Sequence, residues 1–161
     1  DMLAKNFIRV LEEPTDMDAR SAMQQGACLA GLAIEHSMLG ATHALANPLT
    51  SHYNIVHGQA IATMLPHVIR FNAQTSESEY SQLASSVSAV QGNQSCSIAE
   101  FITNITRQAG LATNLQSLGV SRDQLELLAA DAAKQWTAQF NPRTVEVEQL
   151  HELYERAFQD D

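Results

Sequence analysis

Helix-start signals recur along this chain of 161 residues, and they constrain its fold more than any other feature. Four segments have the form of a capping box or its near variant. In that box one side chain accepts a hydrogen bond from a first-turn amide. The side chain three residues later accepts one from the backbone N–H of the capping residue. The four segments are residues 15–18, 76–79, 97–100 and 121–124. Each precedes a stretch with helical periodicity, so the sequence predicts a domain made of helices.

The periodicity of apolar and small residues locates the individual helices. Small residues recur every three or four positions over 19–39, which predicts a helix with one face that a neighbour can approach closely. A shorter helix over 42–46 is expected to end at Pro48, leaving 49–55 as a loop. Further helices are predicted at about 2–11, 57–71, 77–90, 98–109, 122–138 and 146–159, with Pro66 bending one of them. No segment alternates as a strand would, so the predicted fold class is a single all-α domain over 1–161.

Charge and cysteine content exclude several classes of function. The formal net charge is -9 and the nine Lys and Arg residues are scattered, so neither nucleic acid nor an anionic membrane is an expected partner. No apolar run reaches the ~18 residues of a membrane span, and no signal peptide opens the chain. Two cysteines make neither a disulfide framework nor a zinc ribbon, so we expect a cytoplasmic location. Cys28 lies in an apolar run and is predicted to be a buried thiol.

Three of the six histidines fall in the segment THALANPLTSHYNIVHG, residues 42–58. His43 lies near a helix end and His57 opens the next helix, so a reversal of the chain between them could bring both imidazoles to one metal ion. Alternatively, both are structural, with His57 capping its helix and His43 hydrogen-bonded within the bundle. Spacing alone leaves both interpretations open. His52 falls in the expected loop and is interpreted as an exposed polar residue.

The remaining polar candidates are weaker. Asn47 follows His43 by four positions and therefore shares its helical face, where it either orients a ligand or substrate or caps the helix end. His67 is predicted to be a packed residue, and His36 and His151 are expected to be solvated. The chain has no phosphate-binding glycine loop, no nucleophile elbow and no CxxC pair.

Several short motifs, taken together, resemble one known family. They are Ala30-Gly31-Leu32-Ala33, Leu39-Gly40, His43-Ala44, Asn47-Pro48-Leu49, His57-Gly58, Leu65-Pro66-His67-Val68, Phe71-Asn72, Leu118-Gly119-Val120 and Asn141-Pro142-Arg143. In order and rough spacing they resemble the C-terminal helical domain of the iron-containing (group III) alcohol dehydrogenases. The resemblance covers essentially the whole chain and is most specific from Gly31 to Asn72.

The resemblance implies a chemistry for the histidine segment. The family interconverts alcohols with aldehydes or ketones, using NAD(P) and a divalent metal, usually iron and sometimes zinc, which polarises the substrate oxygen. An aspartate and three histidines hold that metal, and two of these histidines match His43 and His57. Asn47 stands where many members have a histidine near the nicotinamide and substrate. An amide cannot relay a proton as imidazole does, but it can donate a hydrogen bond.

The resemblance also implies what this chain is expected to lack. The family's aspartate and first histidine ligand lie in helices that precede the segment opened by Met2, and the nucleotide-binding domain lies further upstream. We therefore expect Fe(II), or Zn(II), at a half-site, and NAD(P) and a small alcohol or aldehyde only when that domain completes the enzyme. Alone, the chain is expected to be inactive. The alternative is a non-catalytic helical interaction module, and an open apolar face is expected to promote self-association.

Overall fold

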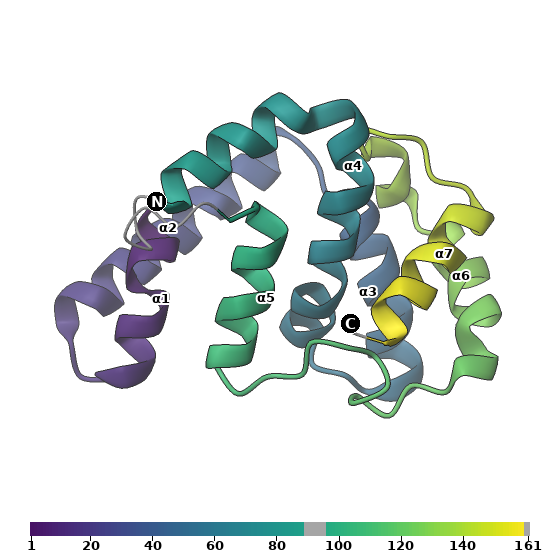
Figure 1. Ribbon diagram of the computed structural model, residues 1–161, viewed down its shortest axis with the longest axis horizontal. Helices are drawn as coiled ribbons and strands as arrows, with labels where there is room; N and C mark the ends of the chain where they lie inside the picture. The colour runs from purple at the N-terminus through teal and green to yellow at the C-terminus, as the bar shows by residue number, and fades with distance from the viewer. Residues whose placement is uncertain (89–95, 160–161) are drawn as a thin grey trace.

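The computed structural model describes residues 1–88 and 96–159 and is drawn in Figure 1. Its helices are α1 (Met2–Glu12), α2 (Met17–His36), α3 (Ala41–Tyr53), α4 (His57–Ser88), α5 (Ile98–Gln108), α6 (Leu125–Ala133) and α7 (Val147–Phe158), with 3₁₀ helices η1 (Arg122–Gln124) and η2 (Trp136–Phe140). No strand occurs in these two ranges, so the predicted all-α class is confirmed. The predicted helix end at residue 90 lies outside them. None of the described helices has both the length and the apolar character that crossing a membrane requires.

α3 forms the centre of the main body, where it packs against α4, α6, α7 and η2. Seven of its 13 residues are buried. Its two leucines, Leu45 and Leu49, are fully buried and belong to the same apolar cluster as Leu128 of α6 and Tyr154 of α7. Burial of this kind is the main favourable term in folding, so α3 is held by the helices that surround it.

Pro48 lies inside α3, and the expectation that it ends the helix is wrong. A proline within a helix removes one backbone hydrogen bond. Here Pro48 is itself buried beside the buried Leu49, so packing outweighs that local cost. Asn54 ends the helix instead, in the left-handed conformation at φ 53°, and its N–H donates to Thr50 O at 3.1 Å. Only residues 54–56 then connect α3 to α4.

α4 has its break at Ser76, whose φ of -131° and ψ of 35° are not helical. The two halves on either side correspond to the helices predicted at 57–71 and 77–90. Pro66 lies within the first half, whereas the residue inside α4 with non-helical angles is Ser76. The capping box predicted at 76–79 therefore falls on this kink.

The other predicted helix starts agree with the structure to different degrees. The box at 97–100 is confirmed, since Ser97 Oγ accepts from Glu100 N at 3.2 Å and Glu100 Oε2 accepts from Ser97 N at 2.8 Å. At the start of α2 the cap is Asp16, not Thr15. Ser121 is the N-cap residue of η1, but its side chain makes no capping hydrogen bond, and its hydroxyl donates to Asp123 instead. Local sequence thus located these starts to within a residue but did not always identify the capping group.

α1 and α2 form a helical hairpin, which we call the arm. Figure 1 shows α1 at the end of the molecule farthest from α6 and α7. No residue of α1 is buried, and only Ala19 and Gly26 of α2 are. The predicted close approach occurs at Gly26, where an added Cβ would lie 2.8 Å from the Leu3 side chain. Beyond Gly26 every residue as far as Met38 is exposed. Cys28 is therefore exposed, and its predicted burial is wrong, because no described residue packs over this half of α2.

Candidate metal site

His43 and His57 lie side by side. Their ring centres are 5.5 Å apart, and the ring planes are tilted by 46°. His43 is half-buried in the first turn of α3, whereas His57 is the exposed first residue of α4. The structure therefore brings together the two histidines that the sequence analysis paired, although the chain between them is mostly helix and not loop.

Backbone and side-chain hydrogen bonds fix the two helix starts that carry these imidazoles. His43 N donates to Gly40 O at 3.2 Å, in the first turn of α3. At the start of α4, Gln59 N donates to Val56 O at 2.8 Å. The Gln59 side chain then ties α4 to the segment after α5, because its Nε2 donates to Ala112 O at 2.7 Å.

The surroundings of His43 favour its neutral form. Burial lowers the pKa of His43 below its ordinary 6.5, and the adjacent His57 imidazole lowers it further by charge repulsion. A neutral imidazole keeps a lone pair on one ring nitrogen, which is the form that binds a metal ion.

The spacing of the two rings suits ligands of a single ion. A divalent ion lies about 2.0–2.1 Å from an imidazole nitrogen, so two imidazoles on one tetrahedral ion have ring centres roughly 5 to 5.5 Å apart. The observed 5.5 Å falls in this range. Among residues 1–88 and 96–159, no group of three or more His, Cys, Asp or Glu side chains is placed to hold a metal. The two imidazoles therefore fit a metal as part of a site, with further ligands required from elsewhere.

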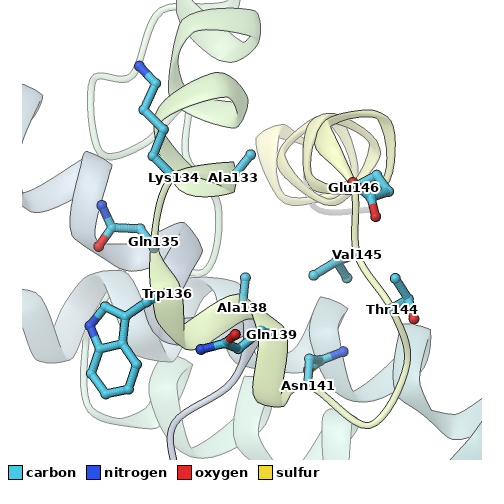
Figure 2. A pocket seen from close by; sticks show the side chains of 10 residues that line it. All are labelled: Ala133, Lys134, Gln135, Trp136, Ala138, Gln139, Asn141, Thr144, Val145 and Glu146. Atoms are coloured by element: carbon cyan, nitrogen blue, oxygen red, sulfur yellow. The ribbon is translucent and has the colours of Figure 1, made fainter.

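Asn47 lies one turn after His43 on α3. The interpretation that it caps a helix end is wrong, because α3 continues to Tyr53. Its Nδ2 donates to Gln135 Oε1 at 2.9 Å. Gln135 precedes η2, as Figure 2 shows, so the amide of Asn47 is held in place by the segment that follows α6.

His52 is not in a loop, which corrects the sequence-based interpretation. It lies exposed in the last turn of α3, and its Nε2 is 2.8 Å from Asp131 Oδ2 of α6. Asp131 also accepts from Lys134 Nζ at 2.8 Å. Both hydrogen bonds lower the pKa of Asp131, and the one from Lys134 has the larger effect. His52 therefore ties α3 to α6. His67 is buried within α4, as predicted.

A hollow of about 420 Å³ lies between η2 and the start of α7. Figure 2 shows its lining, which includes Lys134, Trp136, Asn141 and Glu146. No histidine lines it. It is therefore distinct from the position where the two imidazoles meet.

Sequence reasoning missed the distant partners of side chains on α3. Gln135 is 88 positions from Asn47, and Asp131 is 79 positions from His52. No local spacing marks such pairs. Covariation between positions is the kind of signal that reveals them.

Comparison with known proteins gives consistent results. Residues 1–158 match the family described as "Fe-containing alcohol dehydrogenase family, C-terminal". Lactaldehyde reductase of Escherichia coli (strain K12) is 32% identical over 148 residues, which are 89% of this chain and 39% of the relative. For 1,3-propanediol dehydrogenase of Klebsiella pneumoniae the identity is 28% over 162 residues, covering 98% of this chain and 42% of the relative.

The fold agrees with solved structures as well. The crystal structure of a 1,3-propanediol oxidoreductase superposes with a TM-score of 0.87 at 26% identity, covering 98% of this chain and 42% of that one. An alcohol dehydrogenase from Oenococcus oeni superposes at 0.88 with 21% identity, which supports the fold alone. The 161 residues thus span about two fifths of the length of the proteins they match.

Proposed function

Since this chain belongs to the Fe-containing alcohol dehydrogenase family, whose C-terminal domain it contains, we propose that His43 and His57 supply two ligands of a catalytic metal site. The observation that supports the proposal is the 5.5 Å separation of the two rings, at the positions that match the family's histidines. The proposed ion is Fe(II), with Zn(II) as the alternative, because imidazole suits both metals.

The site needs further parts to work. We propose that an aspartate, another histidine and an NAD(P)-binding domain come from polypeptide outside residues 1–161, which form a single helical domain. Alone, this domain is then catalytically inactive. The relatives are named for lactaldehyde and 1,3-propanediol, which supports a small alcohol or aldehyde as the substrate. A cytoplasmic location and the absence of nucleic-acid and membrane partners remain predictions.

Each residue near the site has a defined task in this proposal. When bound, the metal polarises the substrate oxygen as a Lewis acid. His43 and His57 hold it through one ring nitrogen each. Asn47 lies in the vicinity of substrate and nicotinamide, where Gln135 fixes its amide through the 2.9 Å hydrogen bond. Asn47 can donate a hydrogen bond there, but as an amide it moves no proton.

Metal titration of the purified chain tests the proposal. We expect the parent chain to bind both Fe(II), handled without oxygen, and Zn(II). The His43→Ala, His57→Ala double variant should bind neither ion. His52→Ala is the matched control, since it removes another imidazole from α3, and it should bind as the parent does. Equal binding by parent and double variant would reject the metal-site function. Aldehyde reduction should require addition of a nucleotide-binding domain.

A second candidate function is a helical interaction module, and the arm supports it. Leu29, Leu32 and Ile34 of α2 are 57%, 48% and 44% exposed. We propose that these side chains promote self-association, since apolar surface favours contacts between chains. Sedimentation at increasing concentration should show assemblies that a Leu29→Lys, Leu32→Lys variant does not form. A parent chain that stays monomeric would count against this candidate.

A further inference from the structure

We propose that Asn141 is a positioning residue for the candidate metal site, acting as a helix cap that reaches α3 from near the end of the chain. The inference rests on the proposed function of His43 as a ligand. It also accounts for two of the sequence motifs, Phe71-Asn72 and Asn141-Pro142-Arg143, which contribute no metal ligand.

The start of α3 has no cap of its own. The first amides of a helix have no partner within the helix, and a polar side chain at the N-cap position usually accepts from them. In α3 that position is Gly40, which has no side chain. Asn141 fills the role instead, because its Oδ1 accepts from Ala41 N at 3.3 Å across 100 positions of sequence.

Asn141 is held so completely that its orientation is fixed. Besides Ala41 N, its Oδ1 accepts from Asn72 Nδ2 at 3.0 Å. Its Nδ2 donates to Asn72 Oδ1 and to Arg143 O, both at 2.7 Å. All donors and acceptors of this amide are therefore used, and turning it over would break every one of these hydrogen bonds.

The partners of Asn141 are themselves anchored. Asn72 is only 3% exposed in α4. Arg143 Nη1 donates to Phe71 O at 3.1 Å, and its guanidinium lies 3.8 Å from the centre of the Phe71 ring. The two motifs thus join each other, and together they present a rigid acceptor to the start of α3. Figure 2 shows Asn141 at the end of η2, whose other end follows Gln135, the partner of Asn47.

The residue that Asn141 caps is next in sequence to the residue that bonds the backbone of His43. Gly40 O accepts from His43 N at 3.2 Å, and the next residue, Ala41, donates to Asn141. A Cβ built on Gly40 would lie 3.2 Å from Asn141 Oδ1, closer than ordinary contact. Gly40 has an ordinary extended backbone at φ -124°, so close approach and not conformation explains the glycine. Groups that orient metal ligands typically change metal affinity 10–100-fold when they are removed.

The experiment compares Asn141→Ala with Ser97→Ala in the full 161-residue chain. Ser97 is the N-cap of α5, so the control removes a cap of the same kind from a helix without a ligand. The first readout needs no metal: NMR contacts between the His43 and His57 rings should weaken in Asn141→Ala and persist in Ser97→Ala. The second is Zn(II) affinity, whose Kd should rise about tenfold in Asn141→Ala and change less than twofold in the control.

The outcomes separate this inference from the proposed function. Unchanged ring contacts and Kd in Asn141→Ala would overturn the positioning role. A parent chain that binds no Zn(II) would reject the metal site, while the metal-free ring contacts would still decide whether Asn141 positions His43. If Asn141→Ala does not fold, Gly40→Ala replaces it, because its methyl group would lie 3.2 Å from Asn141 Oδ1 and the amide would have to shift to make room. Ring contacts identical to the parent's in that variant would also overturn the inference.

Discussion

Helix α2 of the arm and α3 of the body are both rich in alanine and other small residues, yet they have opposite environments. Two of the 20 residues of α2 are buried, against seven of the 13 in α3. α3 has partners in α4, α6, α7 and η2, whereas the main partner of α2 is α1. Small residues at helical spacing therefore indicate a helix that neighbours can approach, but they do not identify the neighbour.

This difference predicts two levels of stability in one molecule. Segments with few buried apolar contacts open at lower free energy than the packed core. The body around α3 should therefore determine global unfolding, and the arm should open separately. The candidate metal site lies in the body, so its geometry is expected to be independent of the arm.

Truncating one leucine in each region gives the largest contrast. Leu128→Ala removes a fully buried side chain from the core and should lower the free energy of unfolding by about 2–5 kcal/mol. Leu32→Ala removes a side chain that is 48% exposed and should change it by less than about 0.5 kcal/mol. Urea denaturation monitored by circular dichroism measures both. Equal losses would show that the arm packs as tightly as the body.

Tyr154→Phe tests a single polar contact in the body. Tyr154 is fully buried and its hydroxyl donates to Leu45 O at 2.6 Å, and burial raises the pKa of this hydroxyl. Losing the hydrogen bond should cost about 1 kcal/mol of unfolding free energy. Tyr53→Phe is the control, since the Tyr53 hydroxyl accepts from Ser121 N at 3.3 Å in an exposed setting. A larger loss in the control would contradict the expected order.

Glycine substitutions in α2 test how α1 packs against α2 and whether the arm unfolds independently of the body. Gly26→Ala places a methyl group 2.8 Å from Leu3 and should separate α1 from α2, which speeds amide exchange in α1. Gly31→Ala meets no atom within 4 Å, so it should only gain helix propensity, up to about 1 kcal/mol. The rate of amide hydrogen exchange in α3 should be the same in both variants as in the parent chain. Faster exchange in α3 would mean that arm and body unfold together.

The smallest expected effect concerns the two ion pairs of Asp131, one with Lys134 at the end of α6 and one with His52 of α3. Lys134 and His52 lower the pKa of Asp131 from its ordinary 3.8, so its carboxylate stabilises the fold above that pH. The contribution is lost as pH falls through the lowered pKa. Asp131→Asn should therefore be less stable than the parent at pH 5, with the difference closing below pH 3.8. A difference that stays unchanged below pH 3.8 would contradict this role of Asp131.

Local signals in the sequence predicted local structure well. The box at 97–100, the helix start at His57 and the break near Ser76 are all encoded by neighbouring residues. The fold class followed from helical periodicity, and the family resemblance followed from the order of the motifs. The pairing of His43 with His57 was one of two open interpretations until the resemblance was considered, because spacing does not determine where two helix ends meet.

Features decided by distant contacts could not be predicted. Pro48 should end a helix by local rules, but its burial beside Leu49 keeps α3 intact to Tyr53. Cys28 lies in an apolar run typical of a core, and its exposure depends on what surrounds the arm. Similarly, nothing near residue 40 in the sequence indicates that its helix is capped by Asn141.

The side-chain hydrogen bonds that hold α3 also determine when, during synthesis of the chain, this helix can become fixed. Ala41, Leu45 and Asn47 are bonded by residues 100, 109 and 88 positions later in the chain. At about 5–20 residues per second, the ribosome releases these partners roughly 5 to 20 seconds after the helix they hold. The helix that carries His43 is therefore fixed only after Gln135, Asn141 and Tyr154 have been made. We expect a nascent chain that stops before Gln135 to carry both imidazoles without arranging them, so that competence to load a metal appears only once residues 135–154 have been made.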